Sequence, residues 1–193
     1  MITIVDYGLG NVQAIANIYK RLDVEVSFAR TADELASASH LILPGVGSFD
    51  WAMSRLDASD MRPTLERLVR TDGRPVLGIC VGMQMMAEHS DEGQAPGLGW
   101  IPARVRLFDS ARFSEPTHLP HMGWNDVQPT RDDPLLSELG DDSRFYFLHS
   151  YYFAPDNPQD VLATAVYGDS FACAVRRANV WGVQFHPEKS HQW

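Results

Sequence analysis

The sequence is poor in cysteine and in long apolar segments. Only 2 cysteines occur among its 193 residues, too few for a disulfide framework and typical of a protein in a reducing compartment. No segment reaches the roughly 18 consecutive apolar residues that a membrane-spanning helix needs. The first residues, MITIVDYGLGN, lack the basic start and the apolar length of a secretory signal peptide. These absences predict a cytoplasmic protein with no membrane partner.

Positive charge is scarce as well, since 16 Lys and Arg residues stand against 25 Asp and Glu residues. A nucleic-acid-binding face needs clustered Lys and Arg, and the sequence has no such cluster. It also has no Cys and His group at metal-ligand spacing, so no metal is expected. Gly8-Leu9-Gly10 fails as a dinucleotide fingerprint because Gln13 stands where the third glycine belongs. No organic cofactor is expected either.

The first half of the chain alternates short apolar strands with helical segments. Strands are expected at 2–5, 24–28, 40–43 and 75–79, and helices at 11–21, 31–37 and 60–69. This alternation is typical of parallel βαβ units, whose ligand sites lie outside the carboxyl ends of the strands. The length fits one domain, residues 1–193, with a sizeable core. We therefore predict an α/β fold with a mostly parallel central sheet flanked by helices.

From Trp100 onward the pattern changes to a succession of short strands. They are expected at 104–108, 123–128, 145–153, 161–167, 171–175 and 180–185, with turn signals between them. We expect this second half to add an antiparallel strand set to the parallel sheet. The segment 109–120, which contains several Ser and Pro residues, is expected to be an exposed loop.

A strand, a sharp turn and a helix meet in PVLGICVGMQMM, residues 75–86. Gly78 and Gly82 stand two residues before and two after Cys80, the spacing of a nucleophile elbow with cysteine in place of serine. In that geometry the sulfur lies at the carboxyl edge of the sheet, beside a helix N-terminus whose dipole favours a thiolate. The alternative is a buried core cysteine, which is the commoner fate of a free thiol but needs neither flanking glycine.

His186 is the candidate base for this nucleophile. Pro187 favours extended backbone at His186, so that His186 and Glu188 can share one face of the chain. A carboxylate beside an imidazole fixes its tautomer and stabilises the imidazolium, which makes Cys80, His186 and Glu188 a candidate triad. Taken singly, His186 could be a strand-end histidine and Glu188 a solvated charge. His149 is a rival base, without a carboxylate near it in sequence.

Glycines after the third expected strand suggest an oxyanion site. In Pro44-Gly45-Val46-Gly47 they allow a backbone N–H to turn towards the nucleophile and stabilise the oxyanion of a tetrahedral intermediate. The N–H of Val81 is the natural second donor, because this residue follows the nucleophile. A plain strand-to-helix turn is the alternative reading of the glycines.

Several separated motifs together resemble a known family. The elbow GICVGMQ, the HPE sequence at 186–188, and DYGLGN, PGVGSF and PHMGWN at 6–11, 44–49 and 120–125 resemble class I, triad-type glutamine amidotransferases. With EKS at 188–190, the set is similar to the glutaminase subunits of imidazole glycerol phosphate synthases, in the histidine pathway. The resemblance implies a flavodoxin-like class I amidotransferase fold, and hydrolysis of glutamine to glutamate and ammonia.

The resemblance also implies roles for residues beyond the triad. The oxyanion strand would consist of Gly45, Val46 and Gly47, and one of its peptides would flip before the site becomes active. The glutamine-binding residues would be Gln84, Glu92 and the backbone of Ser150 and Tyr151. The partner contacts would be Asn11, Trp124, Tyr146 and Lys189. Solvated charges remain the alternative for Glu92 and Lys189, and packing for the aromatic run 145–153 and for Cys173.

The implied partner is a (βα)₈-barrel cyclase subunit in a heterodimer, which would receive the ammonia through a tunnel. There the ammonia would convert a phosphoribulosyl nucleotide into imidazole glycerol phosphate and an aminoimidazole carboxamide ribotide. Three other functions stay open: a paralogous glutaminase subunit feeding a sugar-amidating synthetase, a stand-alone γ-glutamyl peptidase, and a non-enzymatic scaffold. The family pattern continues past residue 190 into an amphipathic helix, whereas this sequence stops at His191-Gln192-Trp193.

Overall fold

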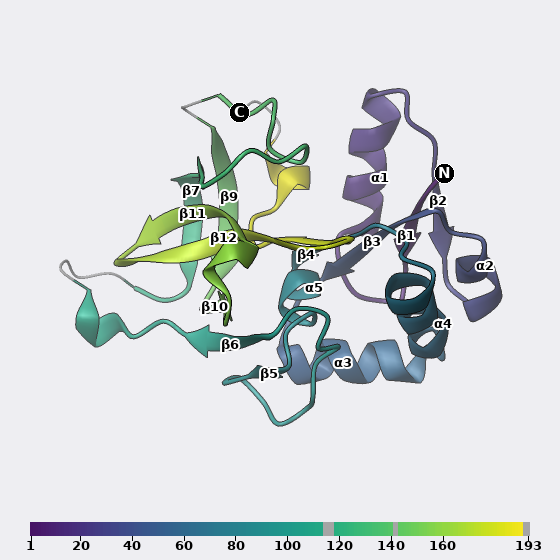
Figure 1. Ribbon diagram of the computed structural model, residues 1–193, viewed down its shortest axis with the longest axis horizontal. Helices are drawn as coiled ribbons and strands as arrows, with labels where there is room; N and C mark the ends of the chain where they lie inside the picture. Colours follow the sequence, from purple (N-terminus) through teal and green to yellow (C-terminus); the bar gives the residue numbers. More distant parts are fainter. Residues whose placement is uncertain (114–117, 141–142, 191–193) are drawn as a thin grey trace.

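The computed structural model describes residues 1–113, 118–140 and 143–190, through which a long mixed sheet runs (Figure 1). Its strand order is β2-β1-β3-β4-β13-β12-β10-β6-β5, with β11 paired to β12 and β8 paired to β11. The strands are β1 (Ile2–Val5), β2 (Val26–Ala29), β3 (His40–Gly45), β4 (Val76–Cys80), β5 (His89–Ser90), β6 (Ala103–Leu107), β8 (Gln128–Pro129), β10 (Tyr151–Pro155), β11 (Val161–Tyr167), β12 (Asp169–Arg177) and β13 (Val180–Val183).

The central part of this sheet is parallel, because β2, β1, β3, β4 and β13 all run in the same direction. β13 is antiparallel to β12, which in turn is antiparallel to β10 and β11. The predicted α/β architecture, a parallel centre extended by an antiparallel set, is confirmed. β13 returns beside β4, so the segment after β13 arrives next to the end of the elbow strand.

Helices cover both faces of the parallel part. They are α1 (Val12–Arg21), α2 (Ala32–Ala36), α3 (Phe49–Ala58), α4 (Arg62–Glu66) and α5 (Val81–Gln84), with a π-helical turn η1 (Arg67–Thr71) and 3₁₀ turns η2 (Ser110–Arg112), η3 (Pro158–Asp160) and η4 (Pro187–Lys189). α1 lies on one face of the sheet, and α3 and α4 lie on the other (Figure 1). α1, expected at 11–21, buries Ile15 and Ala16 against the sheet. No helix in the described ranges is both long and apolar enough to span a membrane.

The helix α3 was not expected from the sequence. Its buried residues Phe49, Ala52, Met53 and Leu56 follow the spacing of one helical face, so the periodic signal was present. Trp51, which is 54% exposed, places a large apolar side chain on the opposite face and obscures the amphipathic pattern. The helix fills the connection between the third and fourth strands and begins directly after the glycine-rich segment at 44–47.

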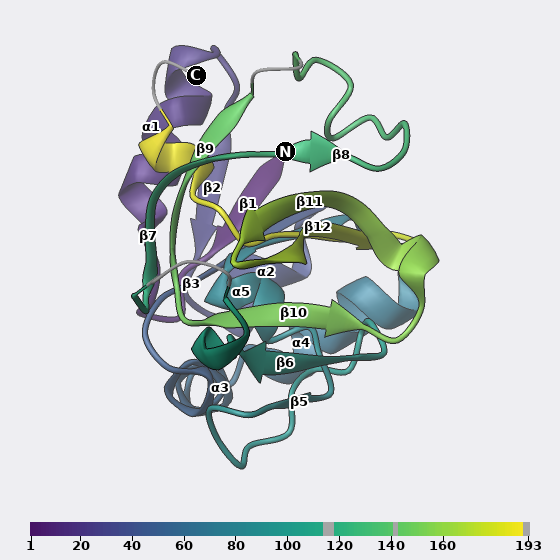
Figure 2. The same cartoon turned by 90° about the vertical axis from the view of Figure 1, so that its left-hand side faces the viewer.

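The expected single strand at 145–153 is wrong, because the chain turns a corner at Ser150. β9 (Arg144–His149) pairs with β7 (His121–Asp126) in a separate two-stranded sheet, whereas β10 belongs to the large sheet. Figure 2 shows β9 running down beside β7 and then turning into β10. The expected strand at 123–128 is likewise divided between β7 and β8. Part of the expected loop at 109–120 lies outside the described residues.

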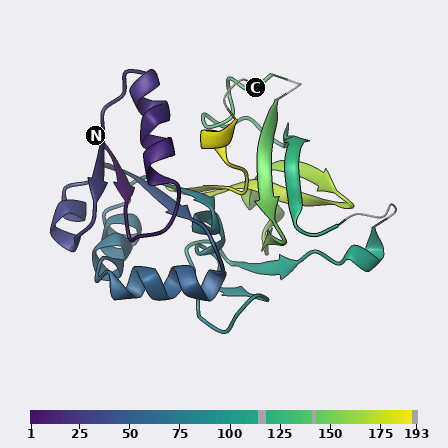
Figure 3. The same cartoon turned by 180° about the vertical axis from the view of Figure 1, so that it is seen from behind.

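The segment after β13 is held between α1 and β9 (Figure 3). The N–H of His186 donates to the carbonyl of Tyr146 at 2.9 Å, and the N–H of Tyr146 donates to the hydroxyl of Ser190 at 3.2 Å. The Ser190 hydroxyl also donates to the carbonyl of His186 at 2.8 Å. These bonds fix the backbone on both sides of η4.

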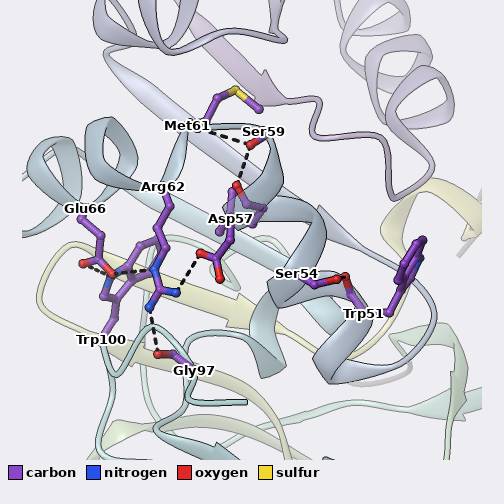
Figure 4. A network of polar contacts seen from close by, with 10 residues as sticks. Trp51, Ser54, Asp57, Ser59, Met61, Arg62, Glu66, Gly97 and Trp100 are labelled. Carbon is purple, nitrogen blue, oxygen red and sulfur yellow. Dashed lines mark hydrogen bonds and ion pairs between the residues drawn. The ribbon is translucent and has the colours of Figure 1, made fainter.

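The connection from α5 to β6 is tied to α4 by a polar network (Figure 4). The Trp100 indole donates to a carboxylate oxygen of Glu66 at 3.1 Å, and Arg62 donates to the carbonyl of Gly97 at 3.5 Å. The network therefore fixes residues 97–100 of this connection against α4.

Candidate active site

Cys80 occupies a strained backbone conformation at the junction of β4 and α5. Its φ of 56° and ψ of −115° lie in a region that side chains rarely adopt, at a cost of about 1–3 kcal/mol. Close packing maintains the strain, because a Cβ on Gly82 would collide with the carbonyl of Leu43. A Cβ on Gly78 would lie 2.7 Å from the carbonyl oxygen of Gly82. The elbow therefore has the tight strand–helix contact that its glycine spacing predicts.

The helix that follows Cys80 is shorter than expected. α5 has only 4 residues, after which the chain continues in turns. A macrodipole requires several aligned turns, so the expected contribution of a helix dipole to thiolate stability is small here. Positive charge at the sulfur has to come from a side chain instead.

His186 supplies that charge. It is 4% exposed, its Nδ1 lies 2.8 Å from Oε1 of Glu188, and it lines the same cavity as Cys80. Burial alone would lower the pKa of His186, but the interactions of its ring with Cys80 and Glu188 outweigh burial and raise this pKa to about 9. An imidazolium beside a cysteine sulfur favours the thiolate, which is the nucleophilic form.

The contact between His186 and Glu188 has a different origin from the one expected. His186 is extended, but Pro187 begins the 3₁₀ turn η4, and this turn folds the carboxylate back onto the imidazole. Glu188 is 2% exposed, so a solvated charge is wrong for this residue.

A cavity of about 290 Å³ opens beside Cys80 and His186. Its lining includes Val46, Gly47 and Val81 from the expected oxyanion segments, together with Gln84, Glu92, Ser150 and Tyr151 from the expected glutamine site. With Cys80, His186 and Lys189, which also line it, ten of the predicted residues surround this one cavity. Gly45 lies just behind this wall, where a Cβ would collide with the backbone N of Gly82.

Gln84 and Glu92 both make contacts with the protein itself. The Gln84 amide donates to the carbonyl of Tyr151 at 3.1 Å and to Oε1 of Gln184 at 3.0 Å, which uses both of its hydrogens. Its own oxygen remains available as an acceptor. One oxygen of Glu92 accepts from the N–H of Phe49 at 2.8 Å, so Glu92 is an anchored carboxylate at the start of α3 rather than a purely solvated charge.

Gln184 is a site residue that the sequence reasoning missed. It is fully buried, and its amide nitrogen donates to the Cys80 sulfur at 3.8 Å. The available signal was its position two residues before His186, because alternate residues of an extended chain face the same side.

His149 lines the cavity but is no rival base. Its Nδ1 lies 2.8 Å from the carbonyl of Tyr151, and its Nε2 lies 3.0 Å from Nδ1 of His121. Burial lowers the pKa of His149 to about 3, with smaller contributions from the neighbouring histidines, so the ring is neutral and both nitrogens are engaged. Cys173 is fully buried in β12, and burial raises the pKa of its thiol, as befits a core residue.

Three of the four expected partner contacts form one surface cluster. The rings of Trp124 and Tyr146 meet edge to face at 6.1 Å, and Nζ of Lys189 lies 5.1 Å from the Tyr146 ring centroid. Trp124 is 41% exposed in this cluster. Asn11, the fourth, directly precedes α1 and is exposed.

The family model described as "Glutamine amidotransferase class-I" matches residues 3–192. The chain belongs to this family. The amidotransferase is 61% identical over 193 residues to the imidazole glycerol phosphate synthase subunit HisH of Bdellovibrio bacteriovorus, covering 100% of this chain and 95% of that relative. It is 48% identical to the HisH subunit of Leptospira interrogans, covering 99% of this chain and 94% of the relative.

Solved structures of other proteins share the fold of this chain. One described as a glutamine amidotransferase superposes with a TM-score of 0.76 at 21% identity, covering 99% of this chain and 92% of the other. The structure of PurLQS from Thermotoga maritima gives a TM-score of 0.69 at 19% identity, covering 97% and 87%. At these identities the likeness concerns the fold alone, and it agrees with the predicted class I amidotransferase fold.

Proposed function

We propose that this amidotransferase is the glutaminase subunit of an imidazole glycerol phosphate synthase in histidine biosynthesis. The observation that carries the proposal is the buried Cys80–His186–Glu188 arrangement beside a cavity of about 290 Å³. Full-length identity of 61% to a HisH subunit favours this pathway over a sugar-amidating synthetase. We propose that residues 1–193 act as one domain.

Glutamine hydrolysis would proceed through a thioester on Cys80. The sulfur attacks the side-chain carboxamide carbon, and the His186 imidazolium protonates the nitrogen as the C–N bond breaks. The products of this step are ammonia and a γ-glutamyl thioester. Water then attacks the thioester carbon, His186 takes the proton of that water, and glutamate leaves as the C–S bond breaks. Glu188 holds the tautomer and stabilises the imidazolium throughout.

The negative oxygen of each tetrahedral intermediate needs backbone donors. The N–H of Val81 and an N–H from Gly45, Val46 or Gly47 are the candidates, and the conformation of Gly47, with a φ of 84°, depends on glycine. Gly45 is fixed by packing at one end of this segment and Glu92 holds Phe49 at the other, so a peptide flip would be confined to the residues between them.

Other groups that line the cavity can bind the α-ammonium and α-carboxylate groups of glutamine. The free oxygen of Gln84 and the carboxylate of Glu92 can accept hydrogen bonds from the α-ammonium group. The backbone of Ser150 and Tyr151 at the corner between β9 and β10 would bind the α-carboxylate.

Ammonia released at Cys80 would pass to a (βα)₈-barrel cyclase subunit in a heterodimer. In bulk water ammonia would be protonated and lose its nucleophilicity, so a closed route between the subunits has a chemical purpose. We propose that the cluster of Trp124, Tyr146 and Lys189, together with Asn11, contacts this cyclase, which makes imidazole glycerol phosphate and an aminoimidazole carboxamide ribotide. Both cysteines are unpaired, which suits a cytoplasmic location.

A glutaminase assay with and without a barrel subunit and its phosphoribulosyl nucleotide tests the function. We expect slow hydrolysis by the isolated chain and an increase on the order of 10²-fold in the complex, because a misoriented oxyanion donor costs about that factor. Cys80→Ala is the control and should abolish the activity. Full activity on γ-glutamyl peptides without a partner would support the peptidase instead, and retained activity in Cys80→Ala would contradict the mechanism.

A further inference from the structure

A continuous chain of hydrogen bonds leads from the β7 strand to the Cys80 sulfur. We name it the β7–Cys80 chain, and it consists of the side chains of Asn125, His121, His149, Gln84 and Gln184 and the carbonyl group of Tyr151. Most of these groups have no part in the bond-making steps proposed above.

The Tyr151 carbonyl determines which groups donate and which accept in the half of the β7–Cys80 chain that lies towards β7. The Tyr151 carbonyl can only accept, so Nδ1 of His149, 2.8 Å away, carries a hydrogen. In a neutral ring Nε2 of His149 then accepts, and Nδ1 of His121 donates to it at 3.0 Å. By the same logic Nε2 of His121 accepts from the amide of Asn125 at 3.2 Å.

Burial keeps both rings in these tautomers. His121 and His149 are 3% and 6% exposed, and burial lowers the pKa of His121 to about 4 and that of His149 to about 3. The ring of His121 is also stacked on Phe147 at 4.8 Å and on Tyr167 at 4.0 Å between centroids. Neither ring can rotate without losing buried hydrogen bonds.

The inner half of the β7–Cys80 chain ends on the nucleophile. The Gln84 amide donates to the Tyr151 carbonyl at 3.1 Å and to the Gln184 oxygen at 3.0 Å. Because the Gln184 oxygen accepts from Gln84, its nitrogen faces Cys80 and donates to the sulfur at 3.8 Å. A donor at this position stabilises the charged form of the sulfur more than the neutral form.

We propose that the β7–Cys80 chain positions the nucleophile and the glutamine-binding amide of Gln84, and couples both to the position of β7. Gln184 is the positioning residue at the sulfur, and His121 is the positioning residue at the strand. The proposal rests on the proposed glutaminase function, because it assigns Cys80 as the nucleophile. If β7 moves, each group of the β7–Cys80 chain must either lose its buried hydrogen bond or shift together with its neighbour. A displacement of β7 would therefore change the position of Gln184 relative to the Cys80 sulfur.

Alkylation of Cys80 by iodoacetamide, followed by mass spectrometry of the Cys80 peptide, tests the proposal without glutamine turnover. Gln184→Met keeps the volume and removes the donor, and we expect alkylation about tenfold slower at pH 7. His121→Phe keeps the stacked ring and interrupts the chain at its strand end. We expect it to slow alkylation about threefold and to raise about tenfold the glutamine concentration that half-protects Cys80.

Thr3→Val is the matched control, because it removes another buried hydrogen-bonded side chain, 2% exposed, in the distant strand β1. It should leave the alkylation rate and the glutamine protection unchanged. In the double variant of His121→Phe and Gln184→Met, alkylation should be no slower than in Gln184→Met alone, because the chain is already interrupted. Additive effects would overturn the proposal, as would a His121→Phe variant that behaves like Thr3→Val.

Imidazole ¹⁵N NMR of the unmodified protein provides a test that depends on no variant. We expect two neutral rings protonated at Nδ1, His121 and His149, from pH 6 to pH 8. Protonation of His149 at Nε2 would overturn the proposal. If alkylation and NMR behave as expected but glutamine is not hydrolysed in the complex, the proposed function fails while the β7–Cys80 chain stands.

Discussion

Nδ1 of His186 lies 2.8 Å from Oε1 of Glu188, and both side chains are almost completely buried. Among the described residues, the other oxygen of Glu188, Oε2, has no hydrogen-bond partner. The carboxylate therefore directs its one strong hydrogen bond to the imidazole. This pair determines the charge next to Cys80.

Glu188→Gln should lower kcat for glutamine hydrolysis by about 10²- to 10⁴-fold. The amide cannot stabilise the imidazolium, and it can hold the ring in the wrong tautomer. The pKa of His186 should also fall, because the carboxylate beside its Nδ1 is lost. Steady-state kinetics in the complex with the barrel subunit would measure the loss in kcat.

Glu188→Asp is the control, because it keeps the charge and should retain more activity than Glu188→Gln. Equal activity of the wild type and Glu188→Gln would show that the carboxylate has no part in the reaction.

The raised pKa of His186 should make stability depend on pH. Its unfolded value is about 6.5 and its folded value is about 9, so the stabilisation is fully present below pH 6.5 and is lost as pH rises towards 9. Urea unfolding at pH 6, 7.5 and 9 should show a falling free energy of unfolding. In His186→Gln this decline should be much weaker, and an equal decline in that variant would assign the effect to other groups.

Glu92→Gln should raise the KM for glutamine by about 10- to 100-fold with a smaller change in kcat. The variant removes the charge that we propose to bind the α-ammonium of the substrate, far from the reacting carbon. The amide oxygen can still accept from the N–H of Phe49, so the start of α3 should remain in place. A fall in kcat alone, with KM unchanged, would contradict a role in glutamine binding.

Gly82→Ala should destabilise the fold by about 3 kcal/mol or more. The added Cβ would meet the carbonyl of Leu43, which belongs to the backbone of β3 and cannot rotate away. Chemical denaturation would measure the change in the free energy of unfolding. Gly140→Ala is the matched control, because, chain neighbours aside, no atom of the described residues lies within 4 Å of the position that its Cβ would take. Similar stability of the two variants would contradict the close packing described for the elbow.

Local sequence patterns were sufficient for the elements that carry the nucleophile and the base. The spacing of Gly78, Cys80 and Gly82 predicts the elbow because the constraint is confined to five successive residues. The helix expected at 31–37 is present as α2, where the Thr31 side chain caps the N-terminus by accepting from the N–H of Glu34 at 3.2 Å. The strand at 161–167 agrees at both ends with β11.

Long-range contacts could not be predicted in the same way. The hydrogen bond between Gln184 and Gln84 joins residues 100 positions apart in the sequence, and the one between Glu92 and Phe49 joins residues 43 positions apart. No sequence periodicity connects such positions. The corner at Ser150 was missed because aromatic and β-branched residues favour strands on both sides of it, and only the pairing partners separate β9 from β10. The fold class and the triad were therefore accessible from sequence, whereas the contacts around the triad were not.

The most direct test of the account is trapping of the acyl intermediate. The complex with the barrel subunit should be mixed with glutamine, quenched in acid within one turnover, digested, and analysed by mass spectrometry. We predict a γ-glutamyl group on the peptide that contains Cys80, sensitive to hydroxylamine as a thioester is, and no such group in Cys80→Ser. Hydrolysis of glutamine with no acyl group on Cys80, or with an acyl group on another residue, would contradict the proposed mechanism.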